Sequence, residues 1–428
     1  MNIQTTLPAK INNITVCANQ TELGVLTYGS VHHYQPIQEK QHVSLTMTQK
    51  GMDGYSSSPL HPIFAQNLPE GFNRRLITEK LARYAKVNDI YLLALQGDQG
   101  IGILSYKSEL NLPDVESLNL SAILSYLSKE PLFPQLLEKY YLRTSLAGMQ
   151  PKVSILNANI VQSDSTVQQR DLIVKSFDSE FALLTVNEFV CMQAARQCGL
   201  EPPETYLSEN LETYVIERFD KSYDGTKFGY EDFTTLMKKA NDPSAKYASS
   251  YETLLKATYL YTGSVAEVEK MYKYIVFNCL IGNGDANLKN FALQYSSDMK
   301  NIFVSPPFDI THTLIYKSID HKMALKLAGS KAFPDLTHLM KLAESDQFRI
   351  RNPKAIIEFL SEKYWTIFAL QMRFNYLMVY EHRLNVQFQI LWRQAMSPKV
   401  IAIIKISVKT YQSINWEIIW LITSCSMH

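Results

Sequence analysis

The stretch CLIGNGDANLKNFAL, residues 279–293, holds an aspartate, Asp285, five residues before an asparagine, Asn290. Both lie in a turn rich in glycine and asparagine, between apolar runs that are typical of a helix before it and a strand after it. Asn, Asp and Gly fill many turns through local hydrogen bonding alone, and a pattern this short recurs by accident. The spacing of the carboxylate and the carboxamide therefore gains meaning only from the rest of the chain.

The overall composition is that of an ordinary globular protein. The chain has 428 residues, enough for two or three domains, with 46% hydrophobic and 19% charged residues. Its net charge of +1 gives no whole-molecule field that would favour nucleic acid or an acidic substrate, although it leaves room for a local basic patch. The bulk composition thus indicates a globular fold and identifies no partner.

Neither the N-terminus nor the cysteines point to secretion. The first residues, MNIQTTLPAKINNITVCANQ, lack the apolar region of a signal peptide, and no apolar run reaches the roughly 18 residues of a membrane span. The five cysteines form no C-x-x-C pair, and Cys191 and Cys198 are expected to be buried thiols on one helix. The sequence therefore predicts a cytoplasmic protein with no membrane contact, no disulfide framework and no cysteine-based zinc site.

Residues 1–108 are predicted to form a small α+β domain. The runs ITVCA and VLTY indicate a hairpin, and a second hairpin is expected in YLLALQGDQGIGILSY, with its turn at 97–100. Between them, HPIFAQNLPEGFNRRLITEKLARYA begins as a loop punctuated by Pro and Gly and becomes a helix. A polar linker, KSELNLPDVESLNL, follows this domain.

Two further regions follow, the first rich in strands and the second in helices. Residues 109–222 carry the strand patterns KVSIL, RDLIVKSF and TYLSENLETYVIERFD, and a helix that ends at Gly199. Residues 223–428 are mostly helical, in EDFTTLMKKA, SYETLLKATYL and AEVEKMYKYIVFNCLIG, with an atypical tail from about 385. A strand-rich lobe followed by a helix-rich lobe favours an α+β enzyme with a cleft.

Several polar side chains occur in the order that a phosphoryl transferase acting on a protein requires. Such an enzyme needs a strand Lys for phosphate, an Asp for the acceptor hydroxyl, and an Asn and a second Asp for Mg²⁺. The D-x-x-x-x-N spacing of Asp285 and Asn290 matches the catalytic loop of protein kinases, and Asp309 follows a strand in NIFVSPPFDI. Upstream, Lys175 ends a strand and Glu188 lies on the next helix, as in the ion pair that positions a kinase Lys.

Each of these features also has a purely structural interpretation. Lys175 could be a solvated strand end, and Glu188 could complement the dipole of its helix. The loop SLAGMQPK, residues 145–152, lacks a P-loop pattern and could either cover phosphates with backbone N–H groups or be an ordinary turn. The stretch YVIERFD, residues 214–220, could be a hinge that binds adenine or a strand end with solvated charges. Their order along the chain favours a kinase.

In these motifs the sequence resembles the HipA-type serine/threonine kinase toxins of bacterial type II toxin–antitoxin systems. The resemblance covers roughly residues 10–345. The fold that it implies is α+β and two-lobed, protein-kinase-like, with an additional small N-terminal α+β domain. It is carried, in order, by FAQNLPEG, SLAGMQPK, IVKSF, NEFVCMQAARQCGL, YVIERFD, YEDF, IGNGDANLKNFAL and PPFDI.

The resemblance also implies roles for individual residues. Asp285 resembles the proton acceptor, and Asn290 and Asp309 resemble the Mg²⁺ ligands. Lys175 resembles the phosphate-pairing Lys, with Glu188 as its supporting partner. ATP and Mg²⁺ are therefore the expected cofactors.

A loop and a hinge complete the implied nucleotide site. Ser145 matches the serine that family members autophosphorylate, which ejects the loop and inactivates the enzyme. The negative charge of a phosphate beside the triphosphate site makes such a switch sensible. The residues expected to contact ATP are Leu146, Ala147, Gly148, Met149, Gln150, Lys152, Lys175, Glu217, Arg218, Phe219, Asn287 and Lys289.

The function implied is an ATP- and Mg²⁺-dependent protein serine/threonine kinase that acts as a growth-arresting toxin. The family's targets are aminoacyl-tRNA synthetases, and a helix-turn-helix antitoxin similar to HipB is the expected partner, which would bring the complex to DNA only indirectly. Three departures from the family motivate an alternative: Asn287 in place of a frequent His, Pro151 in the loop, and the atypical tail from about 385. That alternative is a catalytically weak nucleotide-binding regulator acting through its antitoxin, and a third is a small-molecule kinase.

Overall fold

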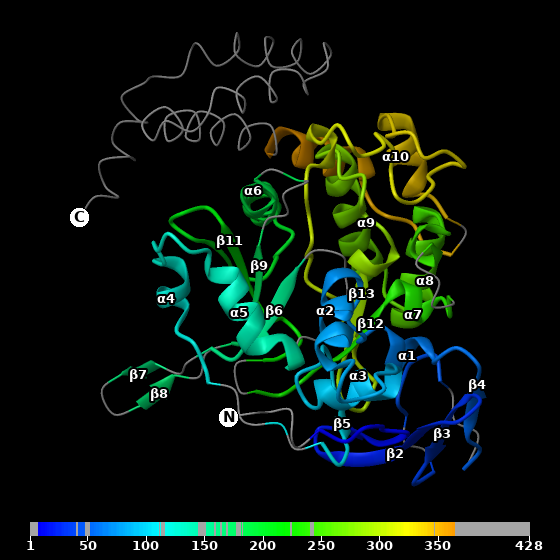
Figure 1. Ribbon diagram of the computed structural model, residues 1–428. Coiled ribbons are helices and arrows are strands. Elements are labelled where there is room, and N and C mark those ends of the chain that lie inside the picture. The colour runs from blue at the N-terminus through cyan, green and yellow to red at the C-terminus, as the bar shows by residue number, and fades with distance from the viewer. Residues whose placement is uncertain are drawn as a thin grey trace.

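The computed structural model describes residues 7–363, with gaps at 40–41, 48–51, 111, 113–115, 144–150, 158–159, 163–164, 168–169, 177–180, 182, 223–224, 240–243 and 346. Ser145, the loop residues 146–150 and the tail from about 385 therefore lie outside the described residues. Figure 1 shows three parts: a blue N-terminal part, a cyan and green part with a central sheet, and a mostly helical part in green to orange.

The N-terminal part is a five-stranded antiparallel sheet, in the order β4-β3-β2-β1-β5, with helices on one face. The predicted hairpin of ITVCA and VLTY is confirmed as β1 and β2. Ile14 and Val16 alternate into the core, where they meet Ile77 and Leu93 from the helices. The elements are β1 (Asn13–Ala18), β2 (Thr21–Tyr28), β3 (His32–Pro36), β4 (Tyr55–Ser57), α1 (Pro62–Ala65), α2 (Gly71–Leu81), α3 (Asp89–Gln96) and β5 (Leu104–Lys107).

The second hairpin predicted in this part is wrong, because its first half is the helix α3. Asn88 caps this helix by accepting a hydrogen bond from the N–H of Tyr91 at 2.8 Å, and Gly97, with φ of 57°, ends it. All residues from Ile90 to Gln96 are buried, so the run shows no helical alternation that would distinguish it from a buried strand. The second half does form a strand, β5, which pairs with β1.

The second part contains an antiparallel four-stranded sheet in the order β10-β11-β9-β6, which confirms the predicted strands. In β9, Leu172 and Val174 face a core that includes α5, while Ile173 and Lys175 face the side of α6. Cys191 and Cys198 are buried there, as predicted. The elements are α4 (Leu120–Leu124), α5 (Leu132–Tyr140), η2 (Tyr141–Arg143), β6 (Lys152–Ile155), β7 (Ile160–Gln162), β8 (Ser165–Val167), β9 (Leu172–Ser176), α6 (Leu184–Gln197), β10 (Thr205–Leu207) and β11 (Thr213–Glu217).

The third part is mostly helical, as predicted, and also contains the small sheet β12-β13-β14. The helix predicted for EDFTTLMKKA is confirmed only over Phe233–Leu236, because Gly229–Asp232 pair with β13 as a strand. The elements are β12 (Gly229–Asp232), α7 (Phe233–Leu236), η3 (Ala245–Tyr247), α8 (Tyr251–Thr262), α9 (Val265–Leu280), η4 (Leu288–Asn290), β13 (Ala292–Tyr295), β14 (Ile302–Val304), η5 (Thr313–Ile315) and α10 (Leu336–Leu342).

The N-terminal part is packed against both of the other parts, with α2 between them (Figure 1). Asn73 on α2 donates to the backbone oxygen of Lys152 at 2.9 Å, and Glu70 forms an ion pair with Lys289 of the helical part. Glu231 of β12 is fully buried and accepts hydrogen bonds that include one from the N–H of Leu45 at 2.7 Å. These contacts confirm a two-lobed α+β fold with an additional N-terminal domain, whereas the boundaries at 108 and 222 stay predictions.

Across the described ranges, no helix combines the length and the apolar character that crossing a membrane requires.

Candidate active site

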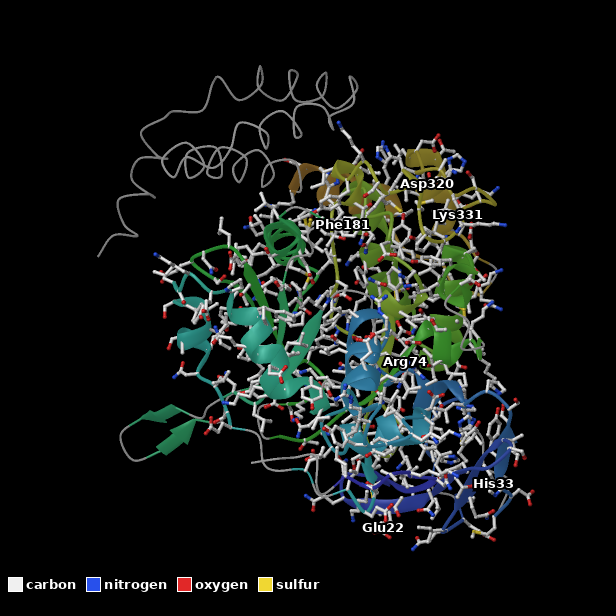
Figure 2. The ribbon with its side chains drawn as sticks, viewed as in Figure 1. Glu22, His33, Arg74, Phe181, Asp320 and Lys331 are labelled. Atoms are coloured by element: carbon white, nitrogen blue, oxygen red, sulfur yellow. The ribbon has the colours of Figure 1, made fainter. Side chains whose placement is uncertain are left out.

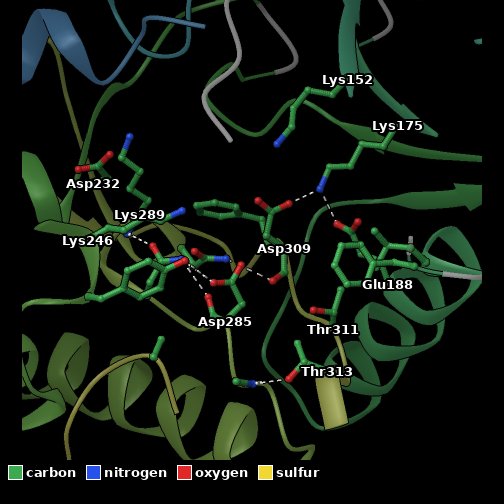
Figure 3. A pocket seen from close by; sticks show the side chains of 18 of the residues that line it. Lys152, Lys175, Glu188, Asp232, Lys246, Asp285, Lys289, Asp309, Thr311 and Thr313 are labelled. Atoms are coloured by element: carbon green, nitrogen blue, oxygen red, sulfur yellow. Dashed lines mark hydrogen bonds and ion pairs between the residues drawn. The ribbon is translucent and has the colours of Figure 1, made fainter. Parts of the chain in front are cut away.

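A cleft of about 850 Å³ lies where the three parts meet (Figure 3). The apolar side chains at one end include Ile173, Ile216 and Phe219, and the polar ones gather around Asp285 and Asp309. The structure thereby brings together residues that are more than 130 positions apart in the chain. The predicted site residues that line the cleft are Lys152, Lys175, Glu188, Phe219, Asp285, Asn287, Lys289, Asn290 and Asp309.

Lys175 lies between two carboxylates. Its Nζ donates to Glu188 Oε1 at 2.6 Å and also to Asp309 Oδ1, as the dashed lines in Figure 3 show. Lys175 is 3% exposed and Glu188 1%. Lys175 is therefore not a solvated strand end, and Glu188 is not a surface residue of its helix. Burial by itself would lower the pKa of Lys175, but the two carboxylates raise it well above its usual value and keep the ammonium charged.

Lys152 reaches the cleft from the neighbouring strand. The antiparallel register of β6 and β9 places Lys152 directly opposite Lys175, so both side chains project from the same face of the sheet. Burial lowers the pKa of Lys152, while the Asp309 carboxylate opposes this shift. Two cations thus approach the carboxylate end of the cleft, an arrangement that suits an anionic ligand.

Asp309 and Asn290 are held side by side. Asn290 Nδ2 donates to the backbone oxygen of Asp309 at 3.4 Å, and the hydroxyl of Tyr274 donates to the backbone oxygens of Asn290 (3.1 Å) and Phe308 (2.8 Å). Asp309 has a φ of 53°, in the left-handed region that non-glycine residues adopt at a cost. Burial would raise the pKa of its carboxyl, but Lys175 and Lys152 lower it, so it stays ionised.

Asp285 projects into the cleft from the turn after α9. The helix ends at Leu280, and Gly282 takes a φ of 70° that lets the chain reverse. Asn283 accepts a hydrogen bond from the N–H of Asp285 at 3.0 Å and so shapes the turn. Asn287 Nδ2 and the Tyr247 hydroxyl both donate to Asp285 Oδ1 at 3.2 Å. Within the described chain, Oδ2 receives no hydrogen bond and remains available to a ligand.

The Asp285 carboxylate is open to the cleft, but protein surrounds it on the other sides. This desolvation raises its pKa, while Lys246 and the hydrogen bonds from Asn287 and Tyr247 act in the opposite direction. A carboxylate with a raised pKa is a better proton acceptor than a fully solvated one. The environment therefore fits a group that receives a proton.

Asn287 supports the loop from within. Its Oδ1 accepts from the N–H of Lys289 at 3.0 Å, which caps η4, and its Nδ2 donates to the backbone oxygen of Asp285 at 3.0 Å. Asn287 is 2% exposed, although it contributes to the cleft wall. Asn287, which stands where the family often has His, thus places an amide that stabilises the loop beside Asp285.

Of the three predicted hinge residues, only Phe219 presents its side chain to the cleft. Glu217 accepts a hydrogen bond from the hydroxyl of Tyr206 at 2.9 Å. The Arg218 guanidinium is fully buried and donates to the backbone oxygens of Gln99 and Gly100, each at 2.7 Å. Glu217 and Arg218 therefore have structural partners, and Arg218 ties the hinge to the N-terminal domain.

The apolar end of the cleft is built from aromatic and branched side chains. The rings of Phe219 and Phe308 stack with their centroids 5.2 Å apart, and Tyr230 lies 6.3 Å from Phe219. Together with Ile173 and Ile216 they line the apolar part of the cleft. A planar heterocycle joined to an anionic group would match both halves of the cleft.

Sequence reasoning misses four contributors: Glu70, Tyr247, Tyr274 and Phe308. Tyr247 contacts Asp285 directly, although it lies 38 residues earlier in the chain, in a short 3₁₀ turn. No sequence motif marks this turn as part of the site. Glu70 lies in the FAQNLPEG stretch, which does mark a special element but gives no hint that its carboxylate reaches Lys289.

Two family models match the chain. The model described as the HipA-like C-terminal domain matches residues 144–365, just over half of the chain. The model described as the HipA N-terminal domain matches residues 14–107. The two matches cover the cleft and the N-terminal domain that packs against it.

Three curated relatives share moderate identity with the chain. A Sinorhizobium fredii protein named as a proposed kinase, Y4mE, is 28% identical over 302 residues, which are 65% of this chain and 70% of that protein. Another proposed kinase of S. fredii, Y4dM, is 28% identical over 51% of this chain and 58% of its own length. A proposed kinase of Haemophilus influenzae is 26% identical over 43% and 57%. The chain thus spans little more than half the length of the last two.

One solved structure shares the fold over most of the chain. It is a chain of the Shewanella oneidensis MR-1 complex of HipA, HipB and operator DNA, with a TM-score of 0.59, 16% sequence identity, and coverage of 83% of this chain and 90% of that chain. At this identity the likeness shows a common fold and no more. It agrees with the two-lobed architecture and the extra N-terminal domain.

Proposed function

Because the chain belongs to the HipA family, we propose that it is an ATP- and Mg²⁺-dependent protein serine/threonine kinase and the toxin of a type II toxin–antitoxin module. Its curated relatives carry the names of proposed kinases, which supports a phosphotransferase. The observation that carries the proposal is Lys175 between Glu188 and Asp309, in one cleft with Asp285 and Asn290. A protein kinase requires a phosphate-pairing Lys, an Asp for the acceptor hydroxyl, and a metal-binding Asn and Asp within one cleft.

The polar end of the cleft fits a magnesium ion. Asn290 and Asp309 are neighbours in the cleft, and their side chains carry amide and carboxylate oxygens, which are the kind of ligand that Mg²⁺ prefers. A site of one or two protein ligands is typical for Mg²⁺, since phosphate oxygens and water complete the shell. When bound, the ion would neutralise charge on the phosphate oxygens during transfer. Lys175 and Lys152 would hold further phosphate oxygens, and Asp309 would release Lys175 to do so.

In the proposed transfer, Asp285 acts on the acceptor hydroxyl. Its Oδ1 is held by Tyr247 and Asn287, which fixes the carboxylate and leaves Oδ2 to accept a hydrogen bond from a serine or threonine. As the bond from the acceptor oxygen to the γ-phosphorus forms, Oδ2 takes the hydroxyl proton. The bond from that phosphorus to the bridging oxygen of ATP breaks, and ADP leaves. Catalysis then rests on positioning and charge compensation.

The test is transfer of label from ATP in the presence of Mg²⁺, with Asp285→Asn as the central variant. The asparagine keeps the size of the side chain and an oxygen for Tyr247 and Asn287, but it cannot take a proton. We expect transfer to fall by about 10²–10⁴-fold while nucleotide binding persists. Asp298→Asn, in the exposed turn between β13 and β14, is the matched control and should keep full activity.

Two results would replace this proposal. Nucleotide binding by the wild-type protein without transfer to any protein would favour the catalytically weak regulator. Label that moves to small molecules and never to protein would favour a small-molecule kinase. Transfer to Ser145 that ceases in Asp285→Asn would support autophosphorylation in addition, and Ser145→Ala should then stay active for longer.

We also propose a helix-turn-helix antitoxin as the partner, with DNA reached only through it, and an aminoacyl-tRNA synthetase as the protein substrate in the cytoplasm. The shared fold with a chain of a HipA–HipB–DNA complex supports the first part. Co-expression with the product of the neighbouring open reading frame should give a stable complex on size exclusion. Failure to copurify would remove the antitoxin from the proposal without affecting the test of transfer.

A further inference from the structure

The cleft extends past Asp285 to a rim with two lysines that have no part in the proposed transfer. This rim, formed by Lys246, Tyr247 and Lys331, is called the outer rim below. Figure 3 shows Lys246 to one side of Asp285 and Lys175 to the other, and Figure 2 shows Lys331 at the surface of the helical part. The outer rim therefore lies where an acceptor segment would approach Asp285.

Tyr247 connects the outer rim to Asp285. Its hydroxyl donates to Asp285 Oδ1 at 3.2 Å, so the ring extends from the carboxylate toward the surface. Two ammonium groups lie close to this ring, Lys246 Nζ at 5.0 Å and Lys331 Nζ at 5.8 Å from its centroid. Both lysines are half-buried, and the ring attracts their charges, so they are held in place more firmly than free surface lysines.

The two lysines differ in their partners from three other lysines of the cleft, Lys175, Lys289 and Lys322. Lys175 and Lys289 form ion pairs with carboxylates of the protein, and Lys322 does so with Asp320 at 3.0 Å. Within the part of the chain that the structure describes, no carboxylate lies within ion-pair distance of Lys246 or Lys331. Among the described residues, the outer rim thus carries two positive charges that form no ion pair, and Lys246 lies close enough to Asp285 to oppose the rise in the pKa of that carboxyl.

We propose that the outer rim docks the acceptor segment of a protein substrate and selects segments with Asp or Glu close to the phosphorylated serine or threonine. The proposal rests on the proposed role of Asp285. An extended chain advances about 3.3–3.6 Å per residue, so carboxylates two or three residues from the acceptor can reach the lysines while the hydroxyl contacts Oδ2. Complementary charge at such a site raises the rate of encounter and the specificity of docking.

An acidic protein segment fits the outer rim better than a nucleic acid does. Single strands bind to grooves in which bases stack on exposed aromatic faces, but the ring of Tyr247 already carries Lys246 and Lys331. The net charge of +1 gives no extended positive field that would collect a polyanion. Two local charges beside Asp285 suit a short acidic stretch.

The test measures binding separately from transfer. A labelled peptide with a central serine flanked by glutamates is titrated with the full chain in the presence of Mg²⁺ and a non-hydrolysable ATP analogue. A peptide with glutamines in place of the glutamates is the neutral reference, and a short single-stranded RNA is the competitor. We expect the acidic peptide to bind at least about tenfold more tightly than the neutral one, with a preference that weakens as salt is added.

The charge-reversed variants Lys331→Glu and Lys246→Glu/Lys331→Glu should lose this preference stepwise. The matched control is Lys326→Glu, an exposed lysine five residues before Lys331 that does not line the cleft, and it should bind as the wild type does. Thermal unfolding of each variant shows that it is folded. Three results would overturn the proposal. They are equal binding of the two peptides, no effect of Lys331→Glu on binding, and displacement of the acidic peptide by the RNA.

Transfer to the same peptides is measured in parallel, so that the two proposals can fail independently. Transfer without a preference for acidic peptides would overturn the docking proposal and leave the kinase proposal intact. Preferential binding without transfer in any condition would do the reverse. If both hold, the charge-reversed double variant should show a KM for the acidic peptide raised by at least about tenfold, with its KM for ATP unchanged.

Discussion

Asn187 pairs with the backbone of His312 in both directions: its Nδ2 donates to the backbone oxygen and its Oδ1 accepts from the N–H, each at 2.9 Å. Asn187 immediately precedes Glu188 on α6, and His312 lies three residues after Asp309. The pairing therefore fixes the helix that carries Glu188 to the segment that carries Asp309. Thr313 in the same segment also accepts from the N–H of Gly284 at 2.8 Å, beside Asp285.

Replacing Asn187 by Ala should loosen this connection. The half-buried backbone N–H and carbonyl of His312 would each lose the hydrogen bond to Asn187, which should cost about 1–3 kcal/mol of unfolding free energy. Phosphoryl transfer should fall further than this loss of stability explains, because Glu188 and Asp309 would no longer move as a unit. Denaturant unfolding and transfer of label measure the two effects. Gln193→Ala on the same helix removes a bond to Thr205 and is the control; equal loss of activity there would contradict the role of Asn187.

Lys175→Met and Asp309→Asn should separate stability from activity. Methionine at 175 leaves the buried Glu188 and the Asp309 carboxylate without the cation between them, which should cost about 3–5 kcal/mol of unfolding free energy. Asparagine at 309 leaves the Lys175–Glu188 pair at 2.6 Å intact, and the Asp309 side chain is 34% exposed. We expect that variant to lose transfer activity while its thermal midpoint stays close to the wild type. A large drop in that midpoint would show that Asp309 is mainly structural.

Much of the candidate site could be predicted because its residues lie on strongly patterned elements. Lys175 ends a buried strand, Glu188 lies on a long helix, and the turn after α9 contains the D-x-x-x-x-N spacing. Hydrophobic periodicity assigns such elements well, and the polar residues stand out against it. The order and spacing of these residues along the chain therefore allow one to predict that their side chains and that of Asp309 lie in one site.

The rest depends on contacts between distant segments. The contact of Arg218 with Gln99 and Gly100 spans about 119 positions, and no local pattern distinguishes a hinge arginine facing a nucleotide from one facing a neighbouring domain. The hydroxyl of Tyr247 reaches Asp285 only through the fold. The helix α3 could not be predicted for another reason: a run that is buried on all sides has no hydrophobic periodicity.

Replacing Arg218 by Met should test its role as a link between domains. The guanidinium is fully buried with Asp220 and the carbonyls of Gln99 and Gly100, so its removal should cost about 3–5 kcal/mol of unfolding free energy. Hydrogen exchange over residues 97–102 should rise, while the affinity for ATP changes little. The control is Arg196→Met, because Arg196 also bonds a carboxylate and two carbonyls but is half-exposed, and its loss should cost about 1 kcal/mol or less. A selective loss of nucleotide affinity in Arg218→Met would instead support the hinge role.

His61 should make the stability of the N-terminal domain depend on pH. Its Nδ1 accepts from the N–H of Ile63 at 3.2 Å, which requires the neutral ring, and burial followed by the charge of Lys238 lowers its pKa to about 4. The unfolded chain, with a His pKa of about 6.5, binds the proton more readily, so the unfolding free energy falls as the pH drops from about 6.5 toward 4. The shift corresponds to about 3 kcal/mol over that window. Denaturant titrations at a series of pH values measure it. His61→Asn keeps a side-chain cap without a titrating ring, so its profile should be flatter in this window; an unchanged slope would mean that His61 is not the group responsible.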